Sequence, residues 1–214
     1  SQIAQWSWDY ESDLSTDATI QNPTNTFTSS GNYTAQLIVT SDSGCVDTLT
    51  KAYQVYVNPI ALFSPDTVCD NYATEFNDQS TLGNTAIEFW NWDFDANTTI
   101  DATIPNPIYT FATLGGNVYL EVIDSNGCSH DTTLNVFVAE NPVALFSFSD
   151  ACYGAGTDFT DLSTSNDGVI SAWNWDFTSD GVVDGTLQNP TNVYGASGTY
   201  TAELVVETEL GCKD

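Results

Sequence analysis

The chain has 214 residues, of which 29 are acidic and only two are basic, so its formal net charge is −27 at pH 7. Such a surface repels the phosphate backbone of nucleic acids and the anionic headgroups of a bilayer, which excludes both as partners. No run of about 18 apolar residues is present, so we predict no membrane insertion.

Four sequence landmarks recur in one order with a period of about 83 residues. The first is a tryptophan motif, found at Trp6–Tyr10, Trp90–Phe94 and Trp173–Phe177, and an Asn-Pro segment, a Gly-led block and a Gly-Cys pair follow each copy. Repetition of this kind is the mark of tandem domains. We predict a partial repeat at 1–57 that lacks its first strands, a complete repeat at 58–140, and a repeat at 141–214 that lacks its last strand.

In chain order, the first predicted strand runs from Ile3 to Tyr10, where large aromatic and small polar residues alternate. The next predicted strand, 33–40, places apolar residues on one face, and the turn at 41–44 leads into a strand at 47–57. These two strands are expected to form a hairpin.

Repeats two and three each open with an Asn-Pro pair, at 58–59 and 141–142, followed by near-identical apolar runs. A proline without a flexible Gly/Ser tract predicts a short, stiff junction, so we expect domains arranged end to end. Further strands are predicted at 74–78 and 157–163. About seven short strands per repeat, separated by Gly, Asn, Asp and Pro turns, predict an all-β chain of tandem immunoglobulin-like sandwiches.

The six tryptophans are the predicted core residues because they lie on one face of each alternating strand. An aromatic platform for a ligand is the alternative interpretation. Tyr33 and Tyr200 lie where a tyrosine hydroxyl can tie a corner between two sheets. The predicted core tryptophans are Trp6, Trp8, Trp90, Trp92, Trp173 and Trp175.

The sequence resembles the polycystic kidney disease (PKD) domain in its Trp-x-Trp-Asp-Phe, Asn-Pro and Gly-Cys-x-Asp landmarks, and in particular bacterial tandem PKD arrays. The resemblance implies seven-stranded sandwiches that serve as extracellular spacers and adhesive modules. The sequence departs from the family pattern at two places. The usual Gly-Asp-Gly is replaced by Glu11-Ser12-Asp13 and its counterparts, and the tyrosine that opens a later strand is aligned with Val118.

Five cysteines in a chain with extracellular character predict disulfides, and Cys45 to Cys69 has the same spacing of 24 as Cys128 to Cys152. Pairing within repeats gives Cys69–Cys128 and Cys152–Cys212, with the partner of Cys45 before residue 1. The two cysteines of one sandwich are, however, expected at opposite ends, which is too far for a disulfide. Cys69 paired with Cys212 of the following repeat is therefore the alternative.

An acidic triplet follows each tryptophan strand with a spacing of four residues. Such oxygen ligands suit a hard cation, so calcium is the candidate cofactor, and the loop at 178–185 resembles a calcium loop most closely. The alternative is that Asp and Asn stabilise turns by accepting hydrogen bonds from their own backbone. The candidate metal ligands are Asp9, Asp13 and Asp17; Asp93, Asn97 and Asp101; and Asp176, Asp180 and Asp184.

No catalytic constellation is evident. His130 is the single histidine, and Cys128 beside it is better explained by a disulfide, so we expect His130 on the surface and no enzymatic activity.

We therefore expect a structural and adhesive stalk within a large secreted cell-surface protein, comparable to adhesins of gliding bacteria exported by a type IX route. Its expected partners are the neighbouring repeats and surface polysaccharide or protein ligands. The alternative is an accessory region that positions substrate for a secreted polysaccharide or protein hydrolase.

Overall fold

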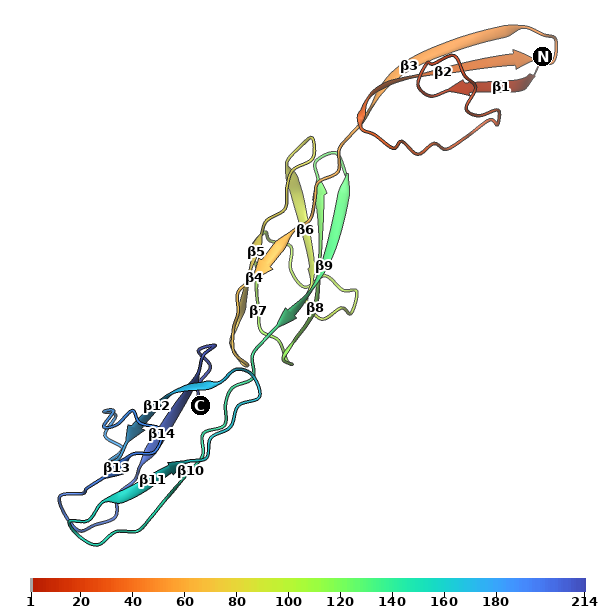
Figure 1. Ribbon diagram of the computed structural model, residues 1–214. Helices are drawn as coiled ribbons and strands as arrows, with labels where there is room; N and C mark the ends of the chain where they lie inside the picture. Colours follow the sequence, from red (N-terminus) through yellow and green to blue (C-terminus); the bar gives the residue numbers. More distant parts are fainter. Residues whose placement is uncertain (1) are drawn as a thin grey trace. The chain divides into compact units, whose positions relative to one another are not determined.

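The computed structural model describes residues 2–214, and all fourteen of its secondary-structure elements are β-strands (Figure 1). Within this range no helix has the length and apolar character needed to cross a bilayer. The chain divides into two compact units. One comprises the residues up to Leu62 with Ser80–Trp90 and Glu121–Asp131; the other comprises Phe63–Gln79, Asn91–Leu120 and Thr132–Asp214.

Repeat one contains a single antiparallel sheet in the order β1-β2-β3, formed by β1 (Ile3–Asp9), β2 (Gly31–Ser41) and β3 (Val46–Val55). The predicted hairpin is confirmed, because β2 pairs with β3 continuously from Gly31 opposite Val55 to Thr40 opposite Val46. The intervening turn has Gly44 at φ 81°, a conformation that glycine adopts without a steric penalty.

Repeat two contains two three-stranded sheets, β4-β5-β7 and β6-β8-β9. An isolated bridge between Ile60 and Thr81 continues the register of β4 and β5, so this pairing extends beyond the named strands. Two antiparallel sheets in one repeat are the expected immunoglobulin-like architecture. The strands are β4 (Phe63–Pro65), β5 (Thr74–Asp78), β6 (Ile87–Asp93), β7 (Ile108–Tyr109), β8 (Gly115–Asp124) and β9 (Ser129–Phe137).

Repeat three reproduces this plan with one strand fewer, since its sheets are β10-β11-β13 and the two-stranded β12-β14. The backbone after β14 turns back at Gly211, and Lys213 forms a bridge to Glu207, which starts a third strand beside β14. The strands are β10 (Phe146–Phe148), β11 (Thr157–Asp161), β12 (Ile170–Asp176), β13 (Thr191–Asn192) and β14 (Glu203–Thr208).

The cores of repeats two and three are aromatic. In repeat two the Trp92 indole, fully buried, lies 5.1 Å from Phe63 and 5.6 Å from Phe76 between ring centroids. In repeat three Trp175, also fully buried, packs in the same way against Phe146 and Phe159. Aromatic pairs in such tilted and edge-on arrangements contribute about 0.5–1.5 kcal/mol each beyond their buried area.

The six predicted core tryptophans differ in burial. Trp92 and Trp175 are buried as predicted, while Trp6, Trp8, Trp90 and Trp173 are half-buried. Trp8 occupies the position of Trp92, but repeat one has no second sheet to cover it. The second indole of each pair donates its Nε1–H to the backbone carbonyl twelve residues later, namely Ile20, Ile104 or Leu187.

The hydroxyls of both predicted tyrosines bond to a backbone carbonyl four residues upstream, although among the described residues repeat one has a single sheet. The hydroxyl of Tyr33 donates to the Ser29 carbonyl oxygen at 2.8 Å, and that of Tyr200 donates to the Ala196 carbonyl oxygen at 3.0 Å. Val118 is not the counterpart of these tyrosines. Tyr33 and Tyr200 each lie twelve residues before the cysteine of the Gly-Cys turn, and the equivalent position in repeat two is Gly116, two residues before Val118.

Candidate functional site

The first acid of each triplet organises the loop that follows the tryptophan strand. The buried Asp93 carboxylate accepts hydrogen bonds from the N–H groups of Asp95, Asn97 and Thr98. Asp9 does the same in repeat one, and in repeat three Asp176 accepts from Thr178 and Gly181. A carboxylate with two or three backbone donors is a strong, local determinant of loop shape.

These hydrogen bonds hold the loop in an unusual backbone conformation that recurs in every repeat. The residues three and five positions after the first acid have positive φ in all three copies: Ser12 and Leu14, Ala96 and Thr98, and Ser179 and Gly181. Only one of the six is glycine. The hydrogen bonds to the acid therefore compensate for the left-handed strain of about 1–2 kcal/mol per non-glycine residue.

The third acid closes the same loop from its other end. Asp17, Asp101 and Asp184 accept from the backbone N–H of the aromatic residue after the first acid, at 2.6, 2.8 and 2.8 Å. Their own N–H groups donate to the carbonyl of the preceding buried or half-buried tryptophan at 2.7 Å in each repeat. The triplets thus perform the backbone role that we gave as the alternative to metal binding.

The middle residues of the triplets also accept hydrogen bonds from residues of their own loops. Asp13 accepts from Ser15, Asp180 accepts from the Val182 N–H, and Asn97 accepts from Thr99. These are side-chain-to-backbone turns of the kind that Asp and Asn favour in loops. Among the described residues, Asp13 and Asp180 belong to no group of three neighbouring carboxylates, while Asn97 stays a predicted ligand.

Three carboxylates do gather in repeat two, but with a different middle member. One oxygen from each of Asp93, Asp95 and Asp101 lies within 4.8 Å of the other two. Asp95 is not among the predicted ligands, and the side-chain amide of the predicted Asn97 donates to it at 2.9 Å. The donor set is oxygen only and partly exposed, which is the chemistry that a hard divalent cation takes. The counterparts of Asp95 are Glu11 and Thr178.

Hydrogen bonding also changes the acidity of the buried acids. Burial raises the pKa of the Asp176 carboxyl, but the backbone donors of Gly181, Thr178 and their neighbours outweigh it, so its pKa lies below the usual value. The same balance holds for Asp161. Burial raises the pKa of this carboxyl, but hydrogen bonds from Ser163, Gln188 and Trp173 outweigh burial and lower it. The Ser163 N–H donates at 2.9 Å, Gln188 Nε2 at 3.1 Å and Trp173 Nε1 at 2.7 Å.

The structure contains the alternative disulfide. Cys69 is bonded to Cys212, with their Cα atoms 5.4 Å apart, so the predicted Cys69–Cys128 and Cys152–Cys212 pairs are wrong. The physical reason is the one raised from topology: the loop after the first strand and the Gly-Cys turn of one sandwich lie at opposite ends. Cys45, Cys128 and Cys152 are free.

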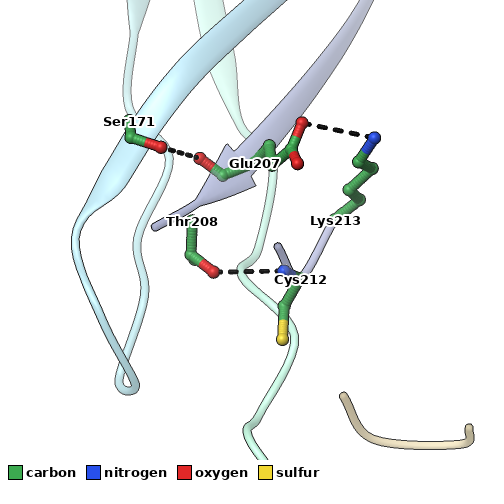
Figure 2. Close-up of polar contacts among 5 residues, drawn as sticks. All are labelled: Ser171, Glu207, Thr208, Cys212 and Lys213. Carbon is green, nitrogen blue, oxygen red and sulfur yellow. Dashed lines mark hydrogen bonds and ion pairs between the residues drawn. The ribbon is translucent and has the colours of Figure 1, made fainter. Parts of the chain in front are cut away.

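The turn that presents Cys212 is fixed by several polar contacts (Figure 2). The Cys212 N–H donates to the Thr208 hydroxyl at 3.2 Å, and Lys213 forms an ion pair with Glu207 at 3.2 Å. The Ser171 hydroxyl donates to the Glu207 carbonyl at 3.4 Å, which ties this turn to β12. Cys212 itself is fully buried.

Backbone contacts accompany the disulfide where repeat two passes into repeat three. Cys69 forms a parallel bridge with Ala139, and the Asn141 side-chain amide donates to the Asp70 carbonyl at 3.3 Å. The Glu140 N–H donates to the Asp167 carboxylate at 2.9 Å. The passage into repeat two has an equivalent contact, since the Val57 N–H donates to Asn84 Oδ1. This junction hydrogen bond is a repeated feature, and no sequence motif marks it.

His130 has a structural role. It is exposed, as predicted, and its Nδ1 accepts a hydrogen bond from the Ala61 N–H at 3.1 Å. In repeat three the Asp214 carboxylate accepts from the Ala144 N–H at 2.8 Å in the same place. His130 therefore substitutes for an acid that accepts from the first apolar run of its repeat.

A family model described as the PKD domain matches residues 1–57 and 139–214, which is more than half of the chain. Repeat two falls almost entirely outside this match. No curated protein sequence matches the chain significantly.

Several solved structures are similar to the chain. The fibronectin(III)-like modules of Clostridium thermocellum CbhA are 14% identical, with 71% of this chain and 88% of that one covered at a TM-score of 0.37. Three N-terminal domains of the highly immunogenic outer capsid protein of bacteriophage RB49 are 11% identical to the chain. The match covers 99% of this chain and 74% of that one, at a TM-score of 0.44. The Ig1–Ig3 ectodomain of mouse nectin-like molecule 4 is 13% identical to the chain. The match covers 83% of this chain and 70% of that one, at a TM-score of 0.31.

The landmark motifs, the paired antiparallel sheets around a buried indole and the family match agree with one another. PKD domains are typically non-catalytic modules, and together with a disulfide they are typical of extracellular proteins. The chain belongs to the PKD domain family.

Proposed function

We propose that the chain is a non-catalytic stalk segment of a large secreted cell-surface protein, in which tandem PKD domains hold an adhesive part away from the cell. The observation that carries the proposal is the Cys69–Cys212 disulfide, which links repeat two covalently to repeat three. A covalent link between successive domains limits how far they can separate. It is useful where the chain must resist being pulled apart.

The hydrogen bonds and burial of the predicted site residues support this function. The acids of the triplets accept backbone hydrogen bonds, the Trp92 and Trp175 indoles are fully buried with their Nε1–H groups bonded, and His130 accepts from Ala61. Buried indoles are not available as a platform on which a polysaccharide could stack. The net charge of −27 favours solubility and mutual repulsion along an extended array.

The parent protein under this proposal is an extracellular surface adhesin of the kind used in gliding motility and exported by a type IX route. The partners of this segment are then the neighbouring repeats, while polysaccharide or protein ligands are met by the adhesive part. Calcium is the cation that we assign to the oxygens of Asp93, Asp95 and Asp101, where it would brace the loop after β6.

Single-molecule stretching tests the stalk. With the disulfide intact, the 143 positions between Cys69 and Cys212 cannot add to the length of a chain pulled by its termini. At 3.3–3.6 Å per residue, Cys69→Ser or a reductant should lengthen the fully stretched chain by roughly 500 Å. Cys45→Ser, which removes a free thiol, is the control and should change nothing. Equal stretched lengths with and without reductant would contradict a force-bearing link.

A further inference from the structure

The five cysteines occupy two kinds of structural position. Cys45, Cys128 and Cys212 each follow a glycine in a turn, and their N–H groups donate to the side-chain oxygen four residues earlier, at 3.0, 2.9 and 3.2 Å. We call these the turn cysteines. The equivalence is close, because the preceding glycines have φ values of 81°, 80° and 86°.

Cys69 and Cys152 occupy the second kind of position, in the loop after the first strand of a repeat. The carbonyl of each accepts from the N–H three residues later, at 3.1 and 2.8 Å. Two residues after each cysteine the backbone is left-handed, at Asn71 and Gly154, with φ values of 68° and 80°. We call these the loop cysteines.

The disulfide in the structure joins the loop cysteine of one repeat to the turn cysteine of the next. Under the same rule Cys152 needs a turn cysteine from a following repeat, whereas Cys128 and Cys45 need loop cysteines from preceding repeats. None of the three free thiols therefore has a permitted partner among the other two. Their free state follows from the rule.

The surroundings of Cys152 give an independent indication of an absent partner. A cavity of about 530 Å³ adjoins this residue and is lined by Phe148, Tyr153 and Tyr200 among others. These aromatic side chains are 63%, 75% and 39% exposed. In repeat two the equivalent cysteine is covered, because Cys69 pairs with the fully buried Ala139 and is bonded to Cys212.

We propose that the free cysteines are docking points for flanking PKD domains, with Cys152 and its aromatic cavity receiving the Gly-Cys turn of a following domain. Cys128 and Cys45 bond in the same way to the loop cysteines of preceding domains. The disulfides then form a ladder in which every repeat is linked covalently to both neighbours. The ladder follows from the junction geometry and holds whether or not the array serves as a stalk.

The chemistry is thiol oxidation between two domains. The Cys152 thiol and the partner thiol lose two protons and two electrons as the S–S bond forms. A disulfide oxidant such as oxidised glutathione accepts them and is reduced to two glutathione thiols. The exchange passes through a mixed disulfide, so an exposed thiol such as that of Cys152 is the better first site of attack.

The test extends the full chain by repeating residues 131–214 directly after Asp214, which continues repeat three in register and adds a fourth repeat. After folding in a glutathione buffer, free thiols are alkylated and disulfides are mapped by mass spectrometry. We expect Cys152 bonded to the appended copy of Cys212, with Cys69–Cys212 retained. Bonds within a repeat, or an alkylated Cys152, would overturn the proposal. Changing the appended copy of Cys212 to Ser is the control, and it should free Cys152 alone.

The unextended chain provides a second test that does not depend on the added repeat. In oxidised glutathione, covalent dimers should join Cys152 of one copy to Cys45 or Cys128 of another, because only these links combine a loop cysteine with a turn cysteine. Dimers dominated by Cys152–Cys152 links, or no dimers at all, would overturn the ladder.

Discussion

The Cα atoms of Cys69 and Cys212 lie 5.4 Å apart, although 143 positions separate the two residues in the sequence. Each cysteine belongs to a different copy of the repeat, and each lies in a local structure that the other copies reproduce. The disulfide therefore joins two positions of the repeat pattern, one in repeat two and the other in repeat three. This relationship accounts for which cysteines are bonded and which are free.

Removal of this disulfide should destabilise the chain. A bond that closes a loop of this length restricts the unfolded ensemble by up to about 5 kcal/mol. We expect Cys69→Ser to lower the free energy of unfolding by several kcal/mol in urea denaturation followed by tryptophan fluorescence. Cys45→Ser is the matched control and should have no effect. A Cys69→Ser variant as stable as the parent would contradict the prediction.

Glycine should be tolerated better than leucine at position 14. Leu14 is 92% exposed and has φ 71°, so the change to glycine loses no packing and relieves left-handed strain. Since glycine also increases the entropy of the unfolded chain, we expect Leu14→Gly to stabilise by about 0.5–1 kcal/mol. Gly181→Leu, at the equivalent position of repeat three, should destabilise by a similar amount. Thermal unfolding that shifts both variants in the same direction would refute this explanation.

The Asp161 carboxylate should stabilise the fold only above acidic pH. Its folded pKa is depressed, so its contribution is complete above the unfolded value of about 3.9 and is lost as the pH falls through the folded pKa. We expect Asp161→Asn to cost about 1–2 kcal/mol at pH 7 and progressively less as the pH falls through the folded pKa. Asp150→Asn, at an exposed carboxylate, controls for the change in net charge. A penalty that does not depend on pH would exclude the ionised acceptor.

Calcium should stabilise the chain through repeat two. Saturation at 100 times the dissociation constant adds about 2.7 kcal/mol to the free energy of unfolding, and a chelator should remove this gain. Asp95→Asn should abolish the response, whereas Asp180→Asn in repeat three should retain it, because only the former side chain belongs to the three-carboxylate group. Identical melting curves with calcium and with chelator would eliminate the site.

The repeated junction hydrogen bond should be visible in hydrogen exchange. Asn84→Ala should speed exchange at the Val57 amide, and Asp167→Ala should do so at the Glu140 amide, because each change removes the acceptor. Asp66→Ala is the control, since Asp66 accepts from the Glu75 N–H and should affect that amide instead. Unchanged exchange at Val57 and Glu140 would show that these bonds do not protect the junctions.

Much of the fold was accessible from the sequence, because the features that define it are local and repeated. Alternation at Trp90 and Trp92 predicted a strand, and the turn at 41–44 predicted the hairpin of β2 and β3. The burial of individual indoles was not accessible, since Trp8 and Trp92 have the same motif and differ only in whether a second sheet covers them. That cover is formed by residues remote from the motif.

The sites were harder to predict than the fold. A spacing of four residues misses Asp95, which joins the acidic group although it lies only two residues after Asp93. The spacing of the cysteines shows where they lie within the repeat. It does not show which cysteines are bonded, because that depends on which ends of successive sandwiches are in contact. The junction hydrogen bonds of Asn84 and Asp167 have no distinctive sequence signal.

Disulfide mapping of the unreduced, alkylated chain by mass spectrometry tests the central claim most directly. We predict one cross-linked peptide pair, containing Cys69 and Cys212, with Cys45, Cys128 and Cys152 recovered in alkylated form. Recovery of Cys69 linked to Cys128, or of Cys152 linked to Cys212, would show that the domains are braced individually and would contradict the covalent connection between repeats.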